Sequence, residues 1–162
     1  AGELPSSLRE ITFHWHGCEL DHGVPYPNIE SLDLYLEAPP DNFDFHKQST
    51  AQLMRLPAMF PNLEKLVLRA PPGERSIGDA ALGNKVWPLK KLTTLRIEGF
   101  SGICGGFMVD APSSLLKDVL LVNCEGVMRS VLVSAKTTNP ALAGTKIRVY
   151  PKRGSGEGAY IL

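Results

Sequence analysis

The chain has 162 residues with 17 basic and 17 acidic side chains, and its formal net charge is zero. This length fits one domain, and the sequence contains neither a basic stripe for nucleic acid nor an apolar run long enough to cross a membrane. We therefore expect a single domain over residues 1–162 with neither nucleic acid nor membrane as its partner. Because the chain begins at Ala1 rather than Met, we expect it to be a piece of a larger protein.

One short pattern, L-x-x-L-x-L, recurs along the chain. Its fourth and sixth positions are apolar and alternate with outward positions, which is the periodicity of a strand. Two copies, residues 27–34 and 61–68, share the longer pattern P-N-[IL]-E-x-L-x-L. The pattern predicts six short strands, in repeats whose first positions are Leu8, Ile29, Leu63, Leu92, Leu116 and, more loosely, Gly144.

Helical periodicity appears between the strands over residues 48–60, 76–86 and 125–136, and Ser76 is a candidate N-cap for the second helix. Two proline pairs, at 39–40 and 71–72, follow strands and are expected to end them, because proline cannot donate to a ladder. The glycine-rich segment 152–159 is expected to be flexible.

These repeats resemble the leucine-rich repeat family, whose signature is L-x-x-L-x-L-x-x-[NC]-x-L. Residues 116–124 match it through the ninth position, which His16, Glu37, Pro71 and Phe100 occupy in other copies. The resemblance implies an α/β fold, a leucine-rich-repeat solenoid of about six irregular repeats. In it a parallel sheet would form the concave face and short helices the convex face.

An ordinary α/β domain is the alternative fold, because it also alternates strands and helices. Its strands would be apolar on both faces. The outward positions here are polar, which favours the solenoid; they include Thr12, His14, Asp33, Tyr35, Arg69, Arg96 and Glu98.

A concave sheet would present the fifth and seventh positions of every repeat as one rigid surface suited to recognition. The predicted protein-binding residues are Thr12, His14, Asp33, Tyr35, Arg69, Arg96, Glu98, Arg148 and Tyr150. The competing surface is the insertion at residues 39–47, which contains Phe43 and Phe45.

The resemblance implies a non-catalytic protein–protein recognition module whose partner is another protein. Irregular repeats of this type resemble the substrate-recruiting regions of F-box proteins in cullin-type ubiquitin ligases. The phrases at 60–66 and 92–99 are also similar to the recognition domains of plant or fungal intracellular immune receptors, which is the alternative role. Three unpaired-looking cysteines, Cys18, Cys104 and Cys124, argue against a disulfide framework, so we expect a cytoplasmic or nuclear location.

An alternative of another class is a metal-binding or thiol enzyme that uses His14, His16 and Cys18. These residues and His22 form the pattern H-x-H-x-C-x3-H, whose side chains can ligate a soft metal. The sequence contains no G-x-S-x-G, Walker loop or H-E-x-x-H motif. We therefore expect that the protein is not an enzyme and takes no metal or other cofactor.

Overall fold

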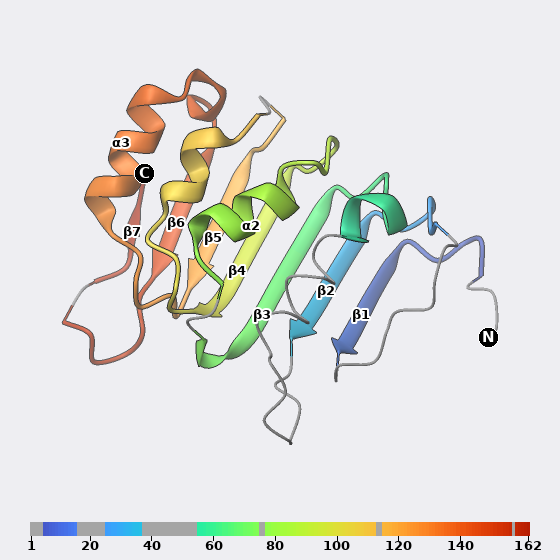
Figure 1. Ribbon diagram of the computed structural model, residues 1–162, viewed down its shortest axis with the longest axis horizontal. Coiled ribbons are helices and arrows are strands. Elements are labelled where there is room, and N and C mark those ends of the chain that lie inside the picture. The colour runs from blue at the N-terminus through green and yellow to red at the C-terminus, as the bar shows by residue number, and fades with distance from the viewer. Residues whose placement is uncertain (1–4, 16–24, 37–54, 75–76, 113–114, 157) are drawn as a thin grey trace.

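A seven-stranded sheet organises the fold, and its strands follow one another in chain order (Figure 1). The computed structural model describes residues 5–15, 25–36, 55–74, 77–112, 115–156 and 158–162. Six strands are parallel: β1 (Glu10–Trp15), β2 (Ser31–Leu36), β3 (Lys65–Glu74), β4 (Thr94–Phe100), β5 (Asp118–Val122) and β6 (Lys146–Tyr150). The seventh, β7 (Tyr160–Ile161), pairs antiparallel with β6. The fold is therefore α/β, with a mostly parallel sheet.

The strand register places equivalent positions of the repeated pattern side by side. The fourth positions form one row across the sheet, Ile11, Leu32, Leu66, Leu95, Val119 and Ile147. The sixth positions form the next row, Phe13, Leu34, Leu68, Ile97, Leu121 and Val149. From β2 to β6 both rows are buried. The six predicted strands and their inward residues are confirmed.

Short helical segments cover the inward face of the sheet (Figure 1). They are the helical residues 55–59, α2 (Asp79–Val86), the 3-10 helix η1 (Gly106–Asp110), α3 (Arg129–Thr138) and the 3-10 helix η2 (Pro140–Leu142). Their apolar side chains join the two strand rows in one buried cluster. No helix in the described ranges has the length and apolar character needed to cross a membrane.

The helix boundaries differ from those expected. The second helix begins at Asp79, with Gly78 as its N-cap residue and no side-chain cap; Ser76 lies outside the described residues. The third begins and ends later than predicted, at Arg129 and Thr138. For the first, predicted over 48–60, residues 55–59 are helical and Phe60 is not, and residues 48–54 lie outside the described residues.

Strand β3 does not end at Pro71, contrary to expectation. It continues to Glu74, with a shift in its pairing to β4 between Arg69 and Glu74. Prolines are tolerated at such irregularities because the ladder is already interrupted there. Opposite this shift, Gly99 has a φ of +85°, and a Cβ added there would lie 2.4 Å from the carbonyl oxygen of Ala70. Only glycine fits this crossing.

The C-terminal residues form a strand that the sequence pattern did not predict. Ile147 and Leu162 exchange backbone hydrogen bonds of 3.1 and 2.8 Å. Tyr160 and Leu162 pack against the buried cluster. In the preceding glycine-rich segment, Lys152 Nζ donates to Glu125 Oε1 over 2.8 Å. The flexibility of residues 152–159 stays a prediction.

Candidate functional site

The nine predicted binding residues all lie on the sheet face opposite the buried cluster. Strand register puts the fifth positions of the repeats in one row and the seventh positions in the next. We call this surface the outer face; it consists of Thr12, Asp33, Val67, Arg96, Leu120 and Arg148 in the first row and His14, Tyr35, Arg69, Glu98, Val122 and Tyr150 in the second. All of these residues are partly or fully exposed except Val67, which is 6% exposed.

Arg69 stands at the centre of a network on the outer face. Its Nε and Nη2 donate to the two carboxylate oxygens of Asp33 over 2.9 and 2.8 Å, the bidentate geometry that arginine favours. Its Nη1 donates to Glu98 Oε2 over 3.3 Å. The hydrogen bond to Asp33 raises the pKa of the Arg69 guanidinium, against the opposing effect of burial. Arg69 is therefore fixed in place rather than free.

Aromatic rings extend this network toward β1. The guanidinium carbon of Arg69 lies 4.9 Å from the centroid of the Tyr35 ring, within the range of a cation–π contact. His14, the other neighbour of Tyr35 in the row, stacks on the Tyr35 ring, with ring centroids 4.5 Å apart and planes 4° from parallel. Over β1 to β4 the outer face is thus a set of mutually ordered charged and aromatic side chains.

The outer face becomes apolar over β5 and β6. Leu120 and Val122 lie on β5, and Tyr150, which is 45% exposed, pairs with Val122 in register. Arg148 donates to both carboxylate oxygens of Asp118, and this bonding raises the pKa of the Arg148 guanidinium. Leu120, Val122 and Asp118 were not among the predicted binding residues. The first two could have been chosen, because they occupy fifth and seventh positions of a repeat.

Two sequence-predicted alternatives lie largely outside the described residues. His16 and Cys18 of the possible metal or thiol site lie outside the described residues. The insertion at 39–47 lies outside them as well. His14 is described and stacks on Tyr35. Within the described ranges no three His, Cys, Asp or Glu side chains are grouped so that they could hold a metal ion.

A second polar site joins α2 to η1. The Asp79 carboxylate accepts hydrogen bonds from the backbone amides of Cys104, Gly105 and Phe107 over 2.9–3.1 Å and from Cys104 Sγ over 2.8 Å. Burial raises the pKa of Asp79, but these hydrogen bonds outweigh it, so the pKa lies below its ordinary value. Because both oxygens accept bonds from the chain itself, this carboxylate fastens η1 to α2.

Neither described thiol has the character of a nucleophile. The hydrogen bond to Asp79, followed by burial, raises the pKa of Cys104. Burial raises the pKa of Cys124 to about 11, and its Sγ lies 3.4 Å from the Val122 carbonyl oxygen and 3.6 Å from that of Ile97. A reactive cysteine has a lowered pKa, so both thiols are suited to packing rather than to catalysis.

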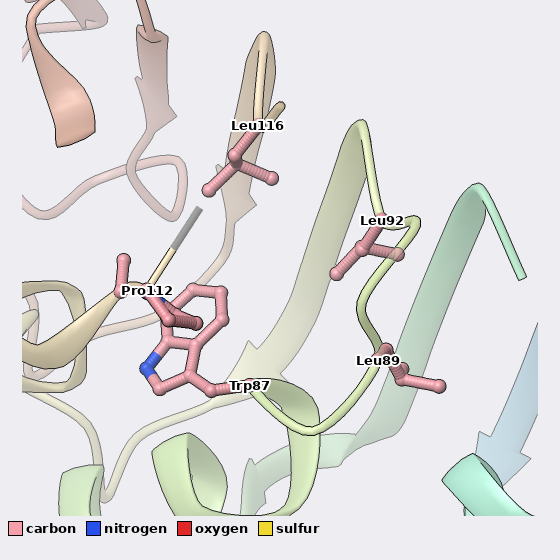
Figure 2. A pocket seen from close by; sticks show the side chains of 6 residues that line it. Trp87, Leu89, Leu92, Pro112 and Leu116 are labelled. Atoms are coloured by element: carbon pink, nitrogen blue, oxygen red, sulfur yellow. The ribbon is translucent and has the colours of Figure 1, made fainter. Parts of the chain in front are cut away.

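Two hollows lie beside these elements. A cleft of about 310 Å³ lies between α2 and η1, with Asp79, Asn84, Trp87 and Asp110 among its lining residues. The other is an apolar notch that five labelled side chains surround in Figure 2. Its volume is about 10 Å³, which is roughly the space of one water molecule. The notch belongs to the packed core and is too small to admit a ligand.

Comparison of the chain with protein-family models, with curated proteins and with solved structures gives no match. The outer face brings polar, aromatic and apolar side chains of six strands together in two adjacent rows. It is therefore the feature from which a function can be inferred.

Proposed function

We propose that this chain is a leucine-rich-repeat solenoid of about six irregular repeats whose outer face binds another protein. The recurring backbone contacts between repeats support the solenoid. In four successive junctions, the amides of the second and third positions both donate to the carbonyl of the second position in the preceding repeat; the acceptors are Arg9, Glu30, Glu64 and Thr93. At the fifth junction Lys146 donates to Lys117, and the Thr145 hydroxyl donates to the Leu116 carbonyl over 2.6 Å. The same pair of backbone bonds thus recurs at four junctions, and one of the two recurs at the fifth.

The turn that precedes each of the first four strands also recurs. The amides of Leu8, Ile29, Leu63 and Leu92 each donate to the carbonyl three residues earlier, at distances of 3.0–3.3 Å. These are the first positions of their repeats, and the last three are buried. Equivalent residues thus make equivalent bonds, as expected of a repeat architecture in which each unit contacts its neighbours.

The ordering of the outer face is the observation that carries the binding proposal. Arg69, Tyr35 and His14 hold one another in place, so they lose little side-chain entropy when a partner docks. Tyrosine and arginine are enriched among residues that dominate binding energy, and on this face Arg96 pairs in register with the apolar Leu120, and Tyr150 with Val122. The proposed role is non-catalytic recognition.

The resemblance to F-box-associated repeats extends this proposal to substrate recruitment for a cullin-type ubiquitin ligase, with recognition in an intracellular immune receptor as the alternative. A cytoplasmic or nuclear location is part of the same proposal. The free thiols of Cys104 and Cys124 support a reducing compartment.

Affinity capture with matched variants tests the binding face. Lysate of the source cells would be passed over immobilised wild type, Val122→Lys and Val133→Lys, and the captured proteins identified by mass spectrometry. Val133 is 43% exposed on α3, so its variant makes the same chemical change on the opposite side of the molecule. We expect Val122→Lys to lose the partner and Val133→Lys to retain it, with both variants folded by circular dichroism. The reverse result would place binding on the helical side and refute the proposal.

A further inference from the structure

The three arginines of the outer face are paired unequally. Arg69 and Arg148 each donate two hydrogen bonds to one carboxylate, Asp33 and Asp118 respectively. Arg96 donates one hydrogen bond, from Nη2 to Glu98 Oε2 over 3.0 Å. That same oxygen already accepts from Arg69. Arg96 is thus the outer-face guanidinium without a carboxylate of its own.

The Nε of Arg96 is buried and has no hydrogen-bond partner within the described part of the chain. A buried polar group without a partner is destabilising, so native proteins seldom leave one unbonded. A guanidinium has five N–H donors, of which Arg96 uses one here. Its side chain is 34% exposed, and Nη1 is neither bonded to the described chain nor among its buried unpaired atoms, so this end of the guanidinium is open to a ligand.

The neighbours of Arg96 are apolar on both sides. In register it lies between Val67 on β3 and Leu120 on β5. Val122 and Tyr150 continue the apolar surface in the next row. A carboxylate bound at Arg96 would therefore be shielded from water by adjoining apolar contacts, the arrangement that strengthens charged hydrogen bonds at interfaces.

We propose that Arg96 is a specificity-determining residue that binds an Asp or Glu side chain of the partner protein. An apolar side chain next to that carboxylate packs on Leu120, Val122 and Tyr150. This inference rests on the proposed binding function of the outer face and specifies the partner's chemistry. Charge complementarity selects an acidic residue because Glu98, the acid beside Arg96, is shared with Arg69.

A random peptide library displayed on phage and selected against the immobilised full chain provides the probe. We expect enriched peptides to carry Asp or Glu beside Leu, Ile or Phe. Losing a charged hydrogen-bond pair costs about 1.5–3 kcal/mol, so Arg96→Gln should weaken the enriched peptides roughly tenfold to a hundredfold. Arg96→Lys, which keeps the charge without the planar fork, should weaken them less.

Arg129→Gln is the matched control, since it changes the same residue type at an exposed position of α3, on the helical side of the molecule. It should leave the peptide affinity within about threefold of wild type. Changing the acidic residue of an enriched peptide to its amide should reproduce the effect of Arg96→Gln. Unfolding curves of each variant would confirm that the fold is retained.

The outcomes separate the two proposals. Enriched peptides without acidic residues, unchanged affinity in Arg96→Gln, or a selection that yields no binders would overturn the role of Arg96. If the enriched peptides failed to bind the Leu120→Lys variant, the outer face would remain the binding site. If binding survived Arg96→Gln, Leu120→Lys and Val122→Lys alike, the proposed function would fail as well.

Discussion

Arg69 is expected to contribute measurably to stability, although it lies on the exposed side of the sheet. Its side chain is 24% exposed, and its guanidinium makes a bidentate pair with Asp33, a bond to Glu98 and a cation–π contact with Tyr35. Each ion pair at such a surface is worth about 0.2–1 kcal/mol, and the cation–π contact about 0.5–1 kcal/mol. Replacing Arg69 with Met keeps the aliphatic stem and removes all three interactions. We expect the free energy of unfolding to fall by about 1–2 kcal/mol.

Urea unfolding monitored by tryptophan fluorescence would measure this loss. A double-mutant cycle with Asp33→Asn isolates the pair and should give a coupling energy of at least about 0.5 kcal/mol. Arg69→Glu should destabilise more than Arg69→Met, because a third carboxylate would then lie between Asp33 and Glu98. A loss below about 0.3 kcal/mol in Arg69→Met, with no coupling to Asp33, would show that the network does not order the outer face.

Three further predictions concern the body of the fold. Gly99→Ala should lower the free energy of unfolding by about 2–3 kcal/mol in denaturant titrations, because the new Cβ would meet the neighbouring strand; Gly144→Ala, where nothing lies within 4 Å, is the control and should stay within about 0.5 kcal/mol. Asp79→Asn should cost about 1–3 kcal/mol at neutral pH, since its amide nitrogen cannot accept the hydrogen bonds that the carboxylate does. The pKa of Asp79 is lower in the native state than in the unfolded chain. Its contribution to stability is therefore full above a pH of about 4 and is lost as the pH falls through the native pKa. A stability difference between wild type and Asp79→Asn that grew on acidification would contradict this. In alkylation at pH 8 followed by peptide mass spectrometry, Cys104 and Cys124 should react slowly, and Asp79→Asn should accelerate Cys104 alone; equal rates for Cys104 in both proteins would count against the hydrogen bond to Asp79.

The repeated pattern was sufficient to predict the strands because it encodes burial directly. Leu95, Val119 and Ile147 each occupy a fourth position, and the register aligns them. Pro71 was misread because a single strand does not reveal the irregular pairing that accommodates proline. The short strand at Tyr160 was missed for a related reason, since two residues carry no periodicity.

The sequence pattern predicted which residues lie on the outer face, but not which hydrogen bonds their side chains make. Alternation alone placed Arg69 and Arg96 outward. It could not show that Arg69 takes Asp33 from one neighbouring strand and Glu98 from the other, because such pairs depend on register and side-chain reach across strands. Arg69 and Arg96 look equivalent in the sequence, but Arg69 is bonded to both neighbouring strands, whereas Arg96 keeps unused donors.

The strict chain order of the sheet bears on how the molecule yields to force. Among the described strands, each one from β2 to β6 is hydrogen-bonded only to the strands that precede and follow it in sequence. Pulling on β1 would therefore peel strands away successively, and the β5–β6 pair would keep its contacts until the tension reached it. An optical-tweezers trace should consequently show several small extensions rather than a single rupture.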